Sequence, residues 1–122
     1  MSDKFDTGDR VRREVLGDHY VETTLTNWAP ARPLLDLITE APWGSVWARD
    51  GLDRSTRSLI TTAILAALGR SEELKLHIKA AIDNNGTSPE ELVEVALHVA
   101  AYAGVPAGLE MAKTVNKIDQ RQ

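Results

Sequence analysis

The chain has 122 residues, of which 43 % are hydrophobic and 26 % charged, and its net charge is -4. This length fits a single domain covering residues 1–122, which buries about two-thirds of its unfolded surface. The acidic balance argues against a nucleic-acid partner, and the one basic run, Arg10 to Arg13, is interpreted as a solvated helix face because acidic residues flank it.

The sequence contains no cysteine, which excludes disulfides, thiol catalysis and thiolate metal sites. The first residues lack the apolar core of a signal peptide. The longest apolar stretch, residues 59–68, is far shorter than the ~20 residues of a membrane span. We therefore expect a cytoplasmic protein with no membrane partner.

In the first half of the chain, helical periodicity predicts a helix over residues 4–16 that ends at Gly17, and a short one over 18–27. Pro33 suits the first turn of a helix that reaches Glu40. Residues 41–53, APWGSVWARDGLD, show no clear periodicity. We interpret them as a long structured loop, and long ordered loops often carry function.

The helices of the second half have clearer ends. One over residues 54–68 is capped by Asp53 and ended by Gly69. Its half from residue 59 to residue 68 is apolar almost all round, so we expect this helix to be central and buried. Ser71 is predicted to cap the next, which ends near residue 85. Ser88 opens a capping box for a helix over residues 89–103, and Pro106 opens a last helix to residue 119. The fold class is therefore all-α.

Polar side chains interrupt three apolar helix faces. Arg70, Glu73 and His77 have spacings that place them within roughly 60° on a helix, pointing where a core is expected. Arg57 shares a face with apolar isoleucines. A third stripe joins Glu94, His98 and Tyr102 at intervals of four residues.

Each of these stripes also has a purely structural interpretation. His98 alone is typical of a satisfied core or interface histidine, and Glu73 with His77 of an ordinary helical pair. A metal site has little support, because no ligand triplet has a recognisable spacing. The combination of Arg57, Glu73 and His77 on faces that should be mutually buried favours function, since buried charges tend to be paired or functional.

Two stretches carry a resemblance to a known family. They are GDRVRREVLGDHYV and the run WGSVWARDGLDRSTRSLITTAILAALGRSEELKLHIKAAIDNNGTSPEELVEVALHVAAYAGVPA, which together cover nearly the whole chain. The sequence resembles the carboxymuconolactone decarboxylase family. The most specific pieces are WGxxWxRxGL, TRSL, EELKLH, the NNGT turn and AYxGxPA.

The resemblance implies a multi-helix bundle of the alkylhydroperoxidase D-like type and a homo-oligomer, a trimer or hexamer. In that superfamily a Cys-x-x-Cys-x-x-x-His signature occupies the corresponding helix. Its histidine falls on His77, and its cysteines fall on Glu73 and Arg70. Peroxidase chemistry is rejected because it needs thiolates. The resemblance therefore implies the same pocket on the same helices, with an acid and a base in place of the two cysteines.

The implied activity is decarboxylation of 4-carboxymuconolactone to 3-oxoadipate enol-lactone in protocatechuate catabolism, the β-ketoadipate pathway. The substrate is a small dicarboxylate lactone, and loss of CO2 leaves a carbanion conjugated to the lactone carbonyl. The lactone is then its own electron sink, so no cofactor and no metal is expected.

Such a site needs cations for the carboxylates, a proton donor and a donor to the lactone oxygen. We assign Arg57 to carboxylate binding, with Arg49 or Arg70 in support. His77 is the candidate proton donor because an ordinary imidazole titrates near ~6.5, and Glu73 would orient it.

The remaining candidates bind substrate. Tyr102 or His98 would donate to the lactone oxygen, and Trp43 or Trp47 would exclude water. Two alternatives remain open: a family member that acts on another small acid or lactone, and a non-catalytic oligomeric binding protein.

Overall fold

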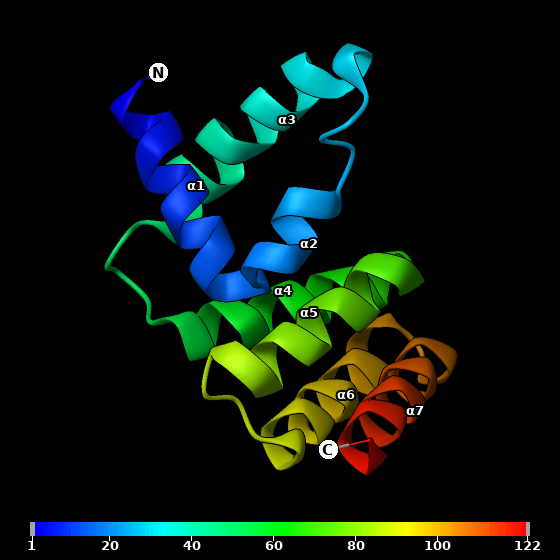
Figure 1. Cartoon of the computed structure of the whole chain (residues 1–122). Coiled ribbons are helices and arrows are strands. Elements are labelled where there is room, and N and C mark those ends of the chain that lie inside the picture. The colour runs from blue at the N-terminus through cyan, green and yellow to red at the C-terminus, as the bar shows by residue number, and fades with distance from the viewer. Residues whose placement is uncertain (1, 122) are drawn as a thin grey trace. The chain divides into compact units, whose positions relative to one another are not determined.

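The computed structural model describes residues 2–121, which form seven α-helices and no strand (Figure 1). The all-α prediction is confirmed. Contacts divide the chain into two compact units, residues 1–53 and residues 54–122, and each is described by itself. None of the helices built from residues 2–121 combines the length and apolar character that a bilayer span requires.

The first unit contains α1 (Asp3–Leu16), α2 (Asp18–Thr23), a 3₁₀ turn η1 (Ala29–Ala31), α3 (Arg32–Ile38) and a π-helix η2 (Thr39–Trp47). Gly17 ends α1 as predicted, with φ of 94° and its N–H donating to the carbonyl of Arg13. Helix α2 ends earlier than predicted. The hydroxyls of Thr23 and Thr24 donate to carbonyls of the preceding turn, a local alternative that competes with further helix.

The predicted loop over residues 41–53 is wrong for its first half, because residues 39–47 form η2. Proline at position 42 has no N–H, and the wider π turn has a period that a search for 3.6 residues per turn does not detect. Trp43 and Trp47 follow each other on this helix and stack, with ring centroids 5.0 Å apart. Both are buried against Val11 and Val15 of α1, and they form the core of this unit.

Two glycines let α1 and η2 cross in backbone contact. A Cβ added at Gly8 would lie 1.9 Å from the carbonyl oxygen of Thr39. A Cβ added at Gly44 would lie 2.4 Å from the carbonyl oxygen of Lys4. No side chain fits at such distances, so the crossing depends on glycine at both positions.

The second unit consists of α4 (Arg54–Leu68), α5 (Ser71–Asn84), α6 (Pro89–Ala103) and α7 (Val105–Gln120). These bounds confirm the predicted helices to within about two residues. The predicted capping box is present, with the Ser88 hydroxyl accepting from the backbone N–H of Glu91 and the Glu91 carboxylate accepting from the N–H of Ser88. The predicted cap at Ser71 is wrong: Arg70 holds the N-cap position, and the Ser71 hydroxyl donates to Glu110 instead.

The core of this unit lies among its four helices. Its buried members are Ala66, Leu74, Ile78, Ala81, Leu92, Ala96, Val99, Met111, Val115 and Ile118. Helices α6 and α7 run side by side (Figure 1) and approach closely, because a Cβ at Gly108 would lie 2.6 Å from the carbonyl oxygen of Ala96. Small residues at the crossing therefore set the spacing of these helices.

The expectation that α4 is buried all round is wrong. Its buried residues are the small Ser58, Thr62 and Ala66. Ile60, Ile64 and Leu68 are 44 %, 52 % and 67 % exposed in the chain. Hydropathy alone did not show which face packs inward, and the buried Thr62 hydroxyl is satisfied by the carbonyl of Ser58 at 2.9 Å.

Candidate functional site

The candidate acid and the candidate carboxylate-binding cation lie on neighbouring helices of the second unit. Arg57 is in the first turn of α4, and His77 is midway along α5, which packs against α4. Both side chains are partly buried. Leu74, Ile78 and Ala81, which the helical wheel placed beside His77, are fully buried and anchor this face of α5 in the core.

Burial changes the chemistry of His77. Desolvation lowers the pKa of its imidazole from 6.5 to about 4, and the negative charge of Glu73 opposes this only in part. The imidazole is therefore neutral near pH 7 in the ligand-free protein. This corrects the expectation of an ordinary pKa near 6.5, and it means that His77 must first take up a proton before it can act as an acid.

The other two residues of the stripe formed by Arg70, Glu73 and His77 lie closer to solvent than His77 does. Glu73 is exposed one turn before His77, and Arg70 is exposed at the N-cap position of α5. The prediction that the stripe points into the core is wrong for Glu73. For Arg70, which precedes the predicted helix cap, the sequence had left this open. Helical phase placed the stripe correctly beside the buried residues, but it did not show that the core ends at His77.

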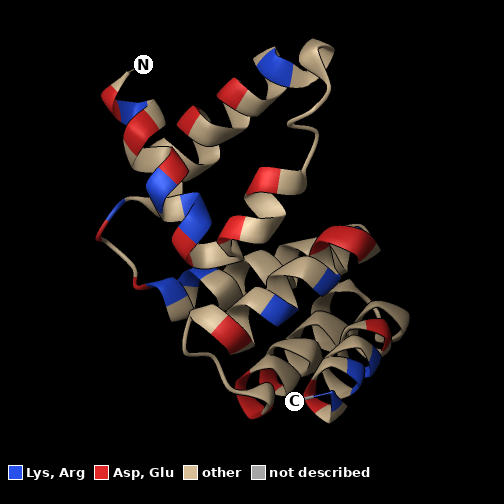
Figure 2. Ribbon diagram, viewed as in Figure 1, with Lys and Arg blue, Asp and Glu red and all other residues tan. Residues whose placement is uncertain are grey.

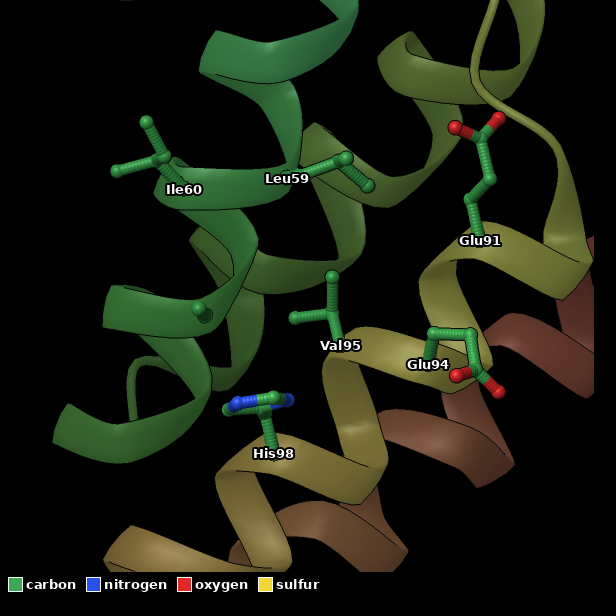
Figure 3. A pocket seen from close by; sticks show the side chains of 7 residues that line it. Leu59, Ile60, Glu91, Glu94, Val95 and His98 are labelled. Atoms are coloured by element: carbon green, nitrogen blue, oxygen red, sulfur yellow. The ribbon is translucent and has the colours of Figure 1, made fainter.

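The third stripe borders a groove between α4 and α6 of about 490 Å³ (Figure 3). Val95 and His98 project from α6 toward α4, and Leu59 points back from α4, while Glu94 lies on the α6 side. The groove is mainly apolar, and its polar groups are an imidazole and carboxylates.

This stripe lies at the surface of the chain, because Glu94 and His98 are exposed and Tyr102 is 87 % exposed. The rings of His98 and Tyr102 stack at 5.8 Å. A core role for His98 is therefore wrong, whereas its role as an interface histidine stays a prediction. The sequence also missed Glu91, which lines the groove; its place in the capping box was visible, but not its contact with the groove.

The tryptophans and the loop arginine belong to the first unit. Trp43 and Trp47 are buried in its core, and Arg49 follows η2 and is exposed. Their assignment to substrate binding stays a prediction. Among residues 2–121, no three His, Asp or Glu side chains gather as they would around a metal ion.

Two kinds of comparison show what the chain is similar to. Residues 32–116 match the carboxymuconolactone decarboxylase family. A nitrosuccinic acid decarboxylase from Metarhizium robertsii is 46 % identical over 117 residues, which cover 92 % of this chain and 81 % of the relative. A 4-carboxymuconolactone decarboxylase from Acinetobacter baylyi is 43 % identical over 118 residues, covering 93 % of this chain and 87 % of the relative. The chain therefore belongs to the carboxymuconolactone decarboxylase family.

Proposed function

We propose that this chain is a decarboxylase that converts 4-carboxymuconolactone to 3-oxoadipate enol-lactone in protocatechuate catabolism, the β-ketoadipate pathway, within the cytoplasm. The family match and the two decarboxylases of similar length support the reaction class. The observation that carries the mechanism is the partly buried side chain of His77 on α5, a helix that packs against α4, which holds Arg57.

The chemistry of the substrate explains which side chains the reaction requires. The departing carboxylate leaves its electron pair on the γ-carbon, and conjugation spreads that charge to the lactone carbonyl. Catalysis then requires binding of the carboxylates, stabilisation of the developing oxyanion and delivery of one proton. Arg57 would bind a carboxylate through its planar fork, with Arg49 or Arg70 in support.

The pKa of His77 suggests the order of proton transfers. A bound carboxylate places negative charge near the imidazole, which raises the imidazole pKa and draws a proton from solvent. The imidazolium then protonates the α-carbon of the delocalised carbanion, which leaves the ring double bond of the enol-lactone, and returns to its neutral state. The balance is one proton consumed and one CO2 released per turnover. Glu73 supports the charged imidazole electrostatically, since its negative charge already raises the His77 pKa.

A second substrate is a candidate because one relative is a nitrosuccinic acid decarboxylase. A nitro group next to the departing carboxylate stabilises the carbanion as a nitronate, as the lactone carbonyl does in the first substrate. Nitrosuccinate also carries a second carboxylate. Both substrates therefore require a carboxylate-binding cation, Arg57, and a proton donor, His77. Selectivity between them would depend on the shape of the pocket.

The decisive experiment supplies each compound to the purified protein without cofactor and measures CO2 release. We expect acceleration with 4-carboxymuconolactone, loss of turnover in His77→Ala, and a raised KM in Arg57→Ala. His19→Ala is the matched control, because His19 is an exposed histidine on α2 of the first unit. Acceleration with nitrosuccinate alone would reassign the substrate, and wild-type turnover in His77→Ala would remove the proton-donor role.

The lactone oxygen would accept a hydrogen bond from Tyr102 or His98. Water would be excluded from the pocket by Trp43 or Trp47. We also propose a homo-oligomer, a trimer or hexamer. Exposed apolar side chains on three helices of the second unit support it, among them Ile64, Leu97 and Val105. Sedimentation equilibrium tests it, and a monomer at micromolar concentration would contradict it.

A further inference from the structure

A buried arginine in the first unit has no ion pair. Arg12 of α1 is 5 % exposed, although the sequence placed it in a solvated helix face. Its Nε is buried and makes no hydrogen bond, and no carboxylate among residues 2–121 lies within ion-pair distance of its guanidinium. Its guanidinium carbon lies 5.9 Å from the centroid of the Tyr20 ring. Burial lowers the pKa of Arg12, which reflects the cost of keeping this charge away from water.

Arg12 lines a cavity of about 230 Å³ whose walls come entirely from the first unit. The other charged groups of the wall already have partners. Arg13 pairs with Asp9 at 3.1 Å, and Arg32 pairs with Asp36 at 3.0 Å. Arg12 is therefore the one cation of this wall with no ion pair of its own, although the more distant negative charge of Asp9 also acts on it.

The neutral polar groups of the wall have no free donors. The Thr39 hydroxyl donates to the carbonyl of Leu35 at 2.7 Å, and the Thr26 hydroxyl donates to the carbonyl of Glu22. Phe5, Val21 and Leu35 supply apolar surface. A ligand that fits these walls therefore has one anionic group and an apolar body.

Size limits the ligand further. A dry cavity of roughly 150 Å³ accommodates a benzene ring, so about 230 Å³ leaves room for a six-membered ring with one carboxylate. The planar guanidinium fork matches the carboxylate geometry. We propose that the first unit binds a small aromatic or alicyclic monocarboxylate, with its carboxylate on Arg12 and its ring against Phe5 and Leu35.

The site is separate in sequence from the residues assigned to decarboxylation. Arg12 lies in the first unit, whereas Arg57 and His77 lie in the second. The inference does not rest on the proposed reaction, since it needs only the unpaired charge and the shape and polarity of the cavity.

Benzoate is the probe, titrated calorimetrically into the full chain. We expect saturable binding that Arg12→Gln weakens at least tenfold, and that benzamide, which has no charge, does not reproduce. Arg10→Gln is the matched control, because Arg10 is an exposed arginine two residues earlier on α1. Arg57→Gln should keep the Arg12-dependent binding, which separates this site from benzoate held by the proposed decarboxylation residues.

A second measurement uses the wild-type chain and needs no folded variant. Phe5 is the single phenylalanine of the sequence, so selective labelling gives one ring signal. Benzoate should shift that signal with the same affinity as the calorimetric titration. An unmoved Phe5 signal at saturating benzoate, or equal affinity in Arg12→Gln, would overturn the proposal. A third result would also overturn it: the wild type does not bind benzoate, and Arg12→Gln changes the number of subunits. The carboxylate that pairs with Arg12 would then come from a second copy of the chain.

Discussion

Lowering the pH should destabilise this protein through His77, and His77→Gln should remove part of that sensitivity. The unfolded imidazole titrates at 6.5, whereas burial lowers the pKa in the folded chain to about 4. Between these values the unfolded state binds the proton and the folded state does not. The contribution of His77 to stability is therefore complete above pH 6.5 and is lost as the pH falls toward 4.

The size of the effect follows from the two pKa values. Each pH unit between them corresponds to about 1.4 kcal/mol, so the interval from 6.5 to about 4 gives roughly 3 kcal/mol at most. His77 is partly rather than fully buried, and solvent screening reduces this to about 1–2 kcal/mol. A loss of this size is measurable in a small domain.

The assay is urea unfolding at a series of pH values for the wild type, His77→Gln and the control His19→Gln. Carboxylates titrate in the same range, so the quantity of interest is the difference between variant and wild type at each pH. The free energy of unfolding of His77→Gln should rise relative to that of the wild type as the pH falls from 6.5 to about 4. The free energy of unfolding of His19→Gln should follow that of the wild type. A difference that is constant with pH would refute the conclusion that burial keeps His77 neutral.

Further predictions concern packing, capping and binding. Gly8→Ala should cost about 3 kcal/mol by overpacking, because its Cβ would lie 1.9 Å from the Thr39 carbonyl oxygen; Gly51→Ala, with open space around it, is the control, and equal stabilities would contradict the close crossing. Ser88→Ala should cost about 1 kcal/mol in thermal or urea unfolding through loss of the capping box, and no loss would show that the cap is replaced by water. Substrate binding to Arg57→Ala should weaken roughly tenfold or more, whereas unchanged KM would place the carboxylate elsewhere. Calorimetry in buffers of different ionisation enthalpy should show proton uptake on substrate binding, which His77→Gln abolishes; an equal uptake in that variant would assign the proton to another group.

The arginines of α1 show what a sequence pattern can and cannot predict about the exposure of charged side chains. The basic run of α1 was interpreted as a solvated face because acidic residues flank it, and basic and acidic segments do alternate along this helix (Figure 2). The interpretation is correct for Arg10 and Arg13, which pair with carboxylates. It is wrong for Arg12, which lies on the buried side of the same helix. The sequence does not indicate that Arg12 is buried. Helical periodicity shows which residues share a face of α1, but not which segment of the chain packs against that face.

The candidate site was predictable in part for a similar reason. His77 lies beside Leu74 and Ile78 on the helical wheel, and the structure places it at the edge of the core they form. Glu73 and Arg70 share its stripe but lie in solvent. The edge of a core depends on which helices pack on a given face, and no local pattern in α5 carries that information.

Local physics explains what the sequence determined by itself. Glycines and a capping box ended the helices, apolar periodicity predicted an all-α chain, and the motifs around EELKLH indicated the family. Tertiary structure alone decided three things: that residues 39–47 form a π-helix stabilised by packing on α1, that α4 turns its small residues inward, and that burial keeps His77 neutral. Helix ends depend on groups a few residues apart, whereas desolvation and face selection depend on contacts between segments distant in the chain.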